Sequence, residues 1–553
     1  MSTIPAICSS ARRAALATLA LAGVTRAVPA QRSHDAAEHL GTVHFPISCS
    51  SQAQSVFDTA LALLHHMTYP QARTEFLRVA TVDPGCAMAH WGVAMTLFQP
   101  LWPTRPGPDD IRLGRDEIGR ARANRAATEG ERLFIEAGGA FFDPPDSVNY
   151  WERIRRWHLA MERVHAAAPS DPEGEVWLAL ADLAAAPPSD TSHRQADRAA
   201  ELLLDVYHRN PDHPGAMHYL IHADDVPGRE HDSPEIVRRY AAIAPQNPHA
   251  LHMPTHIYTR LGEWQEVVRG NLRAADAALR QPAGDGGRYV WDEFPHAVEY
   301  LVYASLQLGA DDAALRQIRR LRQSGPLEPT FKSAFHTAST AARYALERHA
   351  WEEARTLTPR DPSAYTWDRY PWAEAVTWFA RGLGAARERR PAEADSARVR
   401  LVALEAASVK AGEELFSRQI AMLRLAVSGW IAQAGGRPDS AVALLREASA
   451  LEASTPKPAV TPAPTLPADE MLGDLLLEQR HPADALAAYR SALERYPNRL
   501  NSLMGAARAA RMAGDSVVAG DFYRQALAQA GHGSRRAVVS EARAFASPGR
   551  RSR

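Results

Sequence analysis

The feature that most constrains this chain is a pair of histidines that recurs after 34 residues. His218 and His222 reappear as His252 and His256, and the two members of each pair are four residues apart. A spacing of four places both imidazoles on one face of a helix. A fixed period of this length is typical of two-helix units that stack so that equal positions lie side by side. The sequence therefore predicts a stack of helix pairs that brings four histidines onto one surface.

The clearest repeats lie near the C-terminus. Small residues, an aromatic residue and a terminating proline stand there at Gly473, Ala485, Tyr489, Ala492 and Pro497. A second set follows one period later at Ala519, Tyr523 and Ala526. This spacing resembles the tetratricopeptide repeat family, and a weaker match at Ala72, Phe76 and Pro84 extends the resemblance towards the N-terminus. The small residues fit the points where two helix backbones approach closely.

The resemblance implies an all-α fold. We expect an α-solenoid of antiparallel helix pairs that form a right-handed superhelix with a concave groove. Long runs that alternate apolar and polar residues are absent from the sequence, so it predicts no strands. We divide the chain into a signal peptide (1–30), a degenerate repeat array (31–454), a proline-rich linker (455–467), a C-terminal pair of units (468–530) and a disordered basic tail (531–553).

The N-terminus has the order of an export signal. Arg12 and Arg13 precede an apolar run at 14–24, and a small-residue cleavage site follows at 28–30. We therefore expect a mature chain that begins near Gln31 and is periplasmic or secreted.

Removal of that signal would take Cys8 away and leave Cys49 and Cys86. Two cysteines in an oxidising compartment predict a disulfide between them. The alternative is a pair of buried free thiols, because free cysteine is often a core residue.

The charge of the chain is nearly balanced, with 63 basic and 64 acidic residues. This composition provides no electrostatic footprint for nucleic acid or for an anionic membrane. After the N-terminal segment no run of about 18 apolar residues occurs, so we expect no transmembrane span. The expected partner is instead a protein, a peptide or a small molecule in the concave groove.

The register of the resembled family places several further side chains in that groove. The residues that we expect to contact a ligand there are His249, His296, Tyr303, Asp225, Arg260, His336 and Trp91. Two of them have an ordinary structural alternative. Trp91 is equally an aromatic residue of the core, and Asp225 is equally a helix cap.

Histidine chemistry gives a second interpretation of the same surface. Imidazole is the commonest metal-binding side chain, and residues four apart on a helix reach one ion. We therefore predict His218, His222, His252 and His256, together with Glu299, as ligands of zinc or copper. Pro254 interrupts the second pair, and a kink there would turn His252 and His256 apart. Neither pair contains the glutamate of an HExxH motif, so a metalloprotease of that type is not expected.

Two functions follow from these patterns. The first is an exported scaffold protein that recognises a peptide, a protein or a small ligand in a histidine-lined concave groove. The alternative is a metal-binding protein or metalloenzyme that uses the same histidines. The sequence assigns no catalytic residue.

Overall fold

The computed structural model describes residues 39–546, with gaps at 103–104, 125–126, 188–189 and 532. These residues belong to one unit, His39–Arg553. The predicted signal peptide, residues 1–30, lies outside the described residues.

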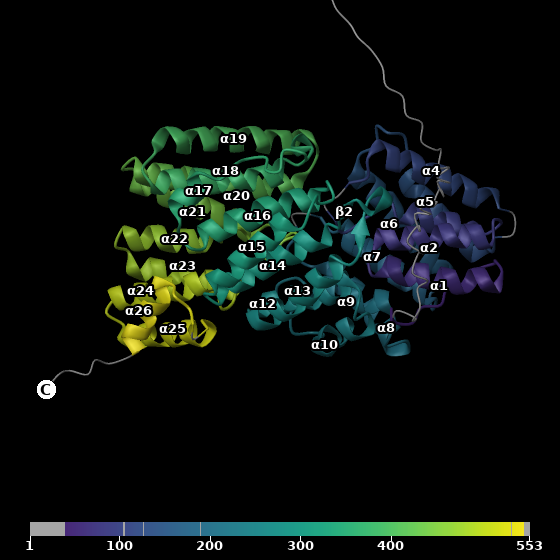
Figure 1. Ribbon diagram of the computed structural model, residues 1–553, viewed down its shortest axis with the longest axis horizontal. Coiled ribbons are helices and arrows are strands. Elements are labelled where there is room, and N and C mark those ends of the chain that lie inside the picture. The colour runs from purple at the N-terminus through teal and green to yellow at the C-terminus, as the bar shows by residue number, and fades with distance from the viewer. Residues whose placement is uncertain (1–38, 103–104, 125–126, 188–189, 532, 547–553) are drawn as a thin grey trace, which may run out of the picture. The chain divides into compact units, whose positions relative to one another are not determined.

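Helices that follow one another in sequence pack against each other as antiparallel pairs (Figure 1). The prediction of an all-α stack of tetratricopeptide-like helix pairs is therefore confirmed. The N-terminal helices are α1 (Ser51–His65), α2 (Tyr69–Val82), α3 (Ala87–Met95), α4 (Pro108–Ala123), α5 (Glu129–Phe142), α6 (Tyr150–Ala167), α7 (Pro172–Ala185) and α8 (Arg194–Arg209). The central helices are α9 (Pro214–Asp224), α10 (Pro234–Ile243), α11 (Pro248–His252), α12 (Pro254–Leu261), α13 (Trp264–Ala278), α14 (Glu293–Gln307), α15 (Asp311–Gln323), α16 (Phe331–Leu346) and α17 (Trp351–Arg355).

The C-terminal helices continue the same arrangement. They are α18 (Pro371–Arg387), α19 (Pro391–Lys410), α20 (Glu414–Ala434), α21 (Pro438–Ala453), α22 (Ala468–Glu478), α23 (Pro482–Arg495), α24 (Leu500–Met512), α25 (Ser516–Gln529) and α26 (Ala537–Ala546). Two short 3₁₀ helices, η1 (Asp285–Gly287) and η2 (Trp367–Arg369), complete the helical elements of the described residues.

The expectation of no strands is wrong in one place. The strands β1 (Pro282–Ala283) and β2 (Tyr289–Val290) pair antiparallel between α13 and α14. Each strand has two residues, which is too short to produce the alternation on which the expectation relied.

Proline and a capping side chain fix where the central helices begin. Pro214 and Pro248 occupy the first turns of α9 and α11, where a missing backbone N–H costs little. The side chain of His213 accepts the N–H of Ala216 at 3.2 Å, and that of Asn247 accepts the N–H of Ala250 at 3.0 Å. All residues of α14 are buried, so polar side chains on any of its faces point into the protein interior.

The C-terminal repeats show why glycine is needed where helices cross. A Cβ atom at Gly505 would lie 2.3 Å from the ring of Tyr489, and one at Gly473 would lie 2.8 Å from it. The ring therefore fills the space that the two glycines leave open. At the other end of the chain, Phe76 covers Gly92 in the same way, because a Cβ there would lie 2.2 Å from its ring.

Part of the predicted basic tail is helical. Residues 537–546 form α26, in which Val539 and Ala542 are buried. The side chain of Glu541 pairs with Arg508 of α24 at 2.6 Å and accepts a hydrogen bond from Tyr523 at 2.7 Å. These contacts hold the segment on the last repeat in spite of its polar composition. Residues 547–553 lie outside the described residues.

The proline-rich segment 455–467, which we call the strap, runs between α21 and α22. It contains no helix, and Val460, Thr461 and Ala463 are buried within it. Arg343 of α16 donates to the carbonyl oxygen of Pro464 at 2.8 Å, and Nζ of Lys457 lies 3.0 Å from Asp225, the residue that follows α9. The segment predicted as a linker thus packs against the central helices.

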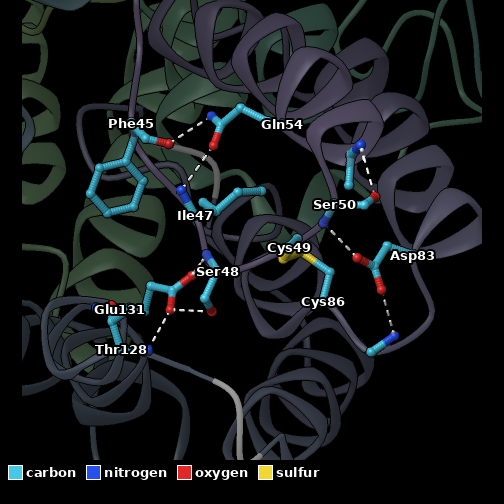
Figure 2. The surroundings of a disulfide bond; sticks show 12 residues. Phe45, Ile47, Ser48, Cys49, Ser50, Gln54, Asp83, Cys86, Thr128 and Glu131 are labelled. Atoms are coloured by element: carbon cyan, nitrogen blue, oxygen red, sulfur yellow. Dashed lines mark hydrogen bonds between the residues drawn. A yellow bond between two sulfur atoms is a disulfide. The ribbon is translucent and has the colours of Figure 1, made fainter.

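A disulfide joins Cys49 and Cys86, whose Cα atoms are 5.3 Å apart (Figure 2). Cys49 precedes α1 and Cys86 is the residue before α3, so the bond ties the start of α1 to the start of α3. Asp83 accepts the backbone N–H groups of Ser50 at 2.8 Å and of Gly85 at 3.2 Å beside it. In the described part of the chain no helix is long and apolar enough to cross a membrane.

Candidate metal centre

Six histidines from α9, α11, α12 and α14 meet in the interior of the central helices. They form two groups, and within each group the potential ligand atoms lie within 4.8 Å of one another. The first triad consists of His218, His222 and His249. The second triad consists of His252, His256 and His296.

The two triads are neighbours. The ring centroids of His222 and His256 are 5.8 Å apart, and those of His249 and His252 are 6.1 Å apart. The structure therefore brings together all four histidines of the recurring pairs and adds one residue from the start of α11 and one from α14.

Pro254 does not separate the second pair. Met253 keeps right-handed helical dihedrals between α11 and α12, and Pro254 is the first residue of α12, where its ring is tolerated. The Nε2 atoms of His252 and His256 consequently lie 3.0 Å apart. The alternative that the proline turns these side chains apart is wrong.

Three of the rings are oriented by an oxygen that faces Nδ1. The Nδ1 atom of His218 lies 2.6 Å from the carbonyl oxygen of His65, and that of His256 lies 2.8 Å from Asp225. The Nδ1 atom of His252 lies 2.6 Å from Oδ1 of Asn271. A carbonyl or carboxylate oxygen only accepts hydrogen bonds, so each of these Nδ1 atoms carries the proton of a neutral ring.

The amide of Asn271 has a defined orientation. Its Nδ2 atom donates to the carbonyl oxygen of Val267 at 2.9 Å and to the hydroxyl of Thr255 at 3.0 Å. Because a carbonyl cannot donate, the nitrogen must be on this side and Oδ1 must face His252.

The Nε2 atoms then face one another as bare acceptors. Those of His218 and His249 are 3.1 Å apart, and Nδ1 of His249 lies 3.2 Å from Glu293. The Nε2 atoms of His222 and His296 are buried and have no hydrogen-bond partner among the described residues. The hydroxyl of Tyr300 is 3.5 Å from Nε2 of His256, which is too long for a strong hydrogen bond. Lone pairs of His218 and His249, and of His252 and His256, therefore face one another, and the unpartnered Nε2 atoms of His222 and His296 complete the two triads.

Burial keeps these rings neutral. For His218, burial and then the neighbouring His249 lower the pKa well below its ordinary value. Burial, followed by His256, lowers the pKa of His252 in the same direction. A neutral imidazole is the form that coordinates metal ions.

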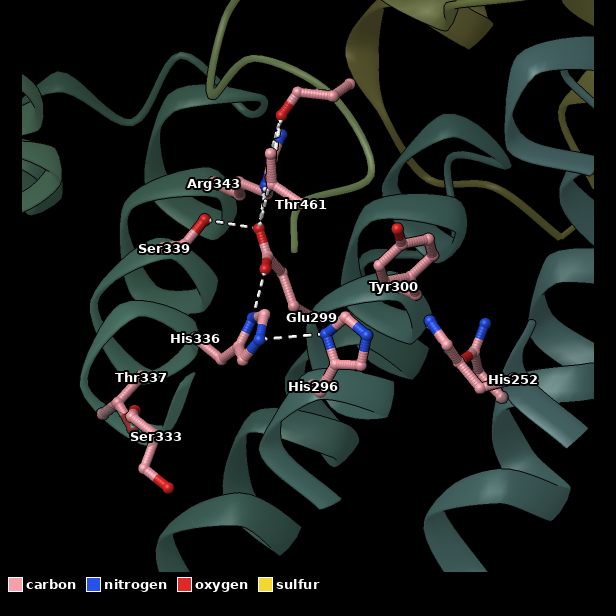
Figure 3. Close-up of polar contacts among 12 residues, drawn as sticks. His252, His296, Glu299, Tyr300, Ser333, His336, Thr337, Ser339, Arg343 and Thr461 are labelled. Atoms are coloured by element: carbon pink, nitrogen blue, oxygen red, sulfur yellow. Dashed lines mark hydrogen bonds and ion pairs between the residues drawn. The ribbon is translucent and has the colours of Figure 1, made fainter. Parts of the chain in front are cut away.

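Glu299 supports the second triad from outside. Its Oε2 atom accepts Nδ1–H of His336 at 2.5 Å, and Nε2 of His336 lies 2.9 Å from Nδ1 of His296 (Figure 3). Its Oε1 atom accepts hydrogen bonds from the hydroxyl of Ser339 at 2.6 Å and from Nε of Arg343 at 2.9 Å. The predicted ligand Glu299 therefore lies away from both triads, because its position on α14 turns it towards α16.

Asp225 anchors the other side of the second triad. Besides His256, it binds Nε of Arg260 at 2.5 Å and Nζ of Lys457 at 3.0 Å. Burial raises the pKa of this carboxyl, but the charges of Lys457 and Arg260 outweigh burial and hold the pKa well below its ordinary value. Asp225 is thus an ionised partner of a ring nitrogen, and it connects the strap to the histidines.

A third cluster provides a contrast. His65, His213 and Glu173 also lie within ligand distance of one another. In this cluster Glu173 accepts from Nε2 of His65 at 3.0 Å and of His213 at 3.2 Å. The Nδ1 atoms face the hydroxyl of Tyr219 at 3.2 Å and the N–H of Ala216 at 3.2 Å. Every ring nitrogen has a partner, so this cluster is complete as a hydrogen-bonded group.

Comparison with known proteins assigns the C-terminal part of the chain. Residues 470–534 match the model of the tetratricopeptide repeat family. The match to this family is limited to that segment. No curated protein matches the sequence. Among solved structures, one similar chain belongs to the Cut9–Hcn1 hetero-tetramer of the APC/C, with 12% identity over 90% of each chain and a TM-score of 0.31. Another is a monomeric mutant of IFIT1 with Gppp-AAAA, with 12% identity over 80% of this chain and 90% of that chain and a TM-score of 0.35.

The matched segment contacts α14 through Arg499. Arg499 is buried and donates to the hydroxyl of Tyr303 at 3.1 Å, and it pairs with Glu470 at 2.8 Å and with Glu347 at 2.9 Å. Tyr303, predicted as a ligand contact, therefore belongs to the contact between the two parts. Trp91 is a core residue, because its ring packs edge-on against Trp177 with a centroid distance of 5.6 Å.

Proposed function

We propose that this protein binds two transition-metal ions, zinc or copper, one at each histidine triad. The observation that carries the proposal is the pairing of bare Nε2 atoms, 3.1 Å apart in the first triad and 3.0 Å apart in the second. Two lone pairs at this distance repel each other, whereas a cation between them turns the contact into coordination. Oriented rings whose Nδ1–H is held by an oxygen are the usual surroundings of metal-binding histidines.

The distances favour a metal ion over water. Tetrahedral zinc with Zn–N bonds of 2.0–2.1 Å holds its nitrogen ligands about 3.3–3.4 Å apart. A water molecule that donates to both nitrogens at the usual distance needs them about 4.4 Å apart. The observed separations of 3.0 and 3.1 Å are close to the first value and well short of the second.

Each ion would receive three imidazoles. Three protein ligands leave a coordination position open, which is the arrangement of catalytic rather than structural zinc sites. The ligand set of six histidines and no thiolate suits zinc and copper. This ligand set supports the metal-binding alternative.

The test is metal analysis of the full chain purified without a histidine tag and loaded with zinc or copper. We expect about two ions per chain, and about one in His218→Ala and in His256→Ala. The matched control is His231→Ala, because His231 is exposed and outside the triads. Folded wild-type protein that takes up no zinc or copper, or triad variants that retain both ions, would exclude the proposal.

A second candidate is the binding of a protein or peptide partner, which the tetratricopeptide repeat at 470–534 supports. Val517 and Met512 of this segment are 75% and 52% exposed, so apolar side chains on its surface are accessible to a partner. A partner isolated from the native source should co-purify with the wild type and be lost with Val517→Glu. Retention of the partner by that variant would place its binding elsewhere.

We also propose that the chain is exported to the periplasm or secreted. The disulfide between Cys49 and Cys86 supports this, since such bonds persist in oxidising compartments. Mass spectrometry of the native N-terminus should find a chain that begins near Gln31. An intact N-terminus in reduced cytoplasmic protein would contradict the proposal.

A further inference from the structure

A cleft of about 220 Å³ opens beside the first triad. His222 lines this cleft, and it is the partly accessible member of a triad whose other two members are buried. The cleft therefore ends at the ring of His222, whose Nε2 atom lies just behind this wall and is itself buried.

The walls of the cleft are largely aromatic and aliphatic. Trp102, Trp151 and Phe416 line it together with leucine and proline side chains. The ring of Trp102 also contacts both triads, because its centroid lies 5.4 Å from that of His249 and 5.5 Å from that of His296. Apolar walls with a few polar groups at one end are typical of sites for small organic molecules.

The two basic side chains of the walls, Arg105 and Lys457, already pair with carboxylates. Arg105 pairs with Glu413 at 3.1 Å and lies over the ring of Tyr150 at 4.0 Å. Lys457 pairs with Asp225 at 3.0 Å. A charged ligand would lose its hydration without gaining a free counter-charge from these residues, so the cleft favours an uncharged one.

The remaining ionisable residues of the cleft do not change this balance. Asp190 and His193 also line it, and both are partly exposed. Asp190 accepts the backbone N–H of Ser192 at 2.8 Å. Asp190 therefore already has a hydrogen-bond donor within its own loop.

We propose that this cleft binds a small uncharged aromatic molecule with one polar atom, of the phenol class, with the ring between the aromatic walls and the oxygen towards His222. The contact of that oxygen with a metal ion rests on the proposed function. The binding of the ring in the cleft does not, so the two parts fail separately.

The first experiment measures binding of phenol to metal-free protein by calorimetry. We expect one site per chain and binding at least tenfold weaker for benzoate and for benzylammonium. Ala459 lines the cleft on the strap, so Ala459→Trp should fill the space and weaken phenol binding at least tenfold. Leu415→Trp fills it from α20 and should have the same effect. The matched control is Ala453→Trp at an exposed position of α21, which should bind phenol like the wild type.

The second experiment uses protein loaded with cobalt(II) in place of the native ion. Addition of phenol should change the visible absorption of the cobalt, because a new ligand at the open position alters its geometry. Unchanged absorption with phenol bound would overturn the metal contact. Phenol binding without any cobalt uptake would refute the proposed metal centre and support the cleft. No phenol binding, or equal binding by the wild type and both folded filling variants, would overturn the cleft proposal.

Discussion

The orientation of one ring in the second triad depends on Asn271, and its replacement should weaken one metal ion selectively. The amide oxygen holds Nδ1–H of His252 at 2.6 Å. In Asn271→Leu this N–H loses its acceptor, and the ring is free to adopt the tautomer that protonates Nε2. Loss of such an outer partner typically lowers metal affinity about 10- to 100-fold, which is about 1.4–2.8 kcal/mol.

The cost to folding should be modest. The other partners of Asn271 keep a bond of their own, because the hydroxyl of Thr255 donates to the carbonyl oxygen of His252 at 2.6 Å and Val267 remains within α13. Only the buried Nδ1–H of His252 is left without a partner, and this should lower the free energy of unfolding by about 1–3 kcal/mol.

The assay is a titration of metal-free protein with zinc against a competing chelator, which resolves the two sites. We expect the affinity of one site to fall in Asn271→Leu and that of the other to stay within about threefold, because the first triad is held by the carbonyl oxygen of His65 and by Glu293. In Asn271→Asp the carboxylate still accepts Nδ1–H, so most of the affinity should return. Equal weakening of both sites, or no change at either, would refute the reasoning.

Three further predictions concern stability. Burial raises the pKa of Glu452 to about 7, so between pH 4.5 and pH 7 the folded protein holds a proton that the unfolded chain releases. The free energy of unfolding should therefore fall by about 3 kcal/mol between pH 4.5 and pH 8. Urea unfolding of Glu452→Gln should lack that part of the pH dependence. His218 and His252 have lowered pKa values, so the unfolded chain binds protons that the folded metal-free chain does not, and thermal melts should show stability decreasing as the pH falls below about 6.5. Gly505→Ala should lower the free energy of unfolding by about 1–3 kcal/mol, because its Cβ would lie 2.3 Å from the ring of Tyr489; an unchanged melt would show that the ring moves aside freely.

The sequence predicted the helix pairs and the gathering of the recurring histidines, because both depend on periodicity. The sequence did not predict how the histidines divide into two triads. Equal positions of consecutive repeats suggested that His218 meets His252, whereas the structure joins His218 to His249. Short helices that begin at Pro248 and Pro254 shift the register by a few residues, and a simple period does not contain that information.

The outer partners of the triads could not be found from the pattern. Asn271 lies on α13 and Lys457 lies in the strap, and neither belongs to a repeating motif. Their positions follow from tertiary packing. The composition of the strap predicted a linker, whereas its position depends on contacts with distant residues, such as that of Arg343 with Pro464. Glu299 was predicted as a metal ligand, but on α14 it faces α16 and binds His336, Ser339 and Arg343.

The strap also sets an order of events for a newly made chain. About 200 residues separate His256 from Lys457, whose side chain binds the carboxylate that orients that histidine. At a synthesis rate of about 5–20 residues per second, the strap emerges about 10–40 s after the histidines. During this interval the triads lack the segment that later packs beside them. A metal ion supplied early would meet an uncovered set of ligands, whereas one supplied to the finished protein would have to enter along His222 or wait for the strap to detach.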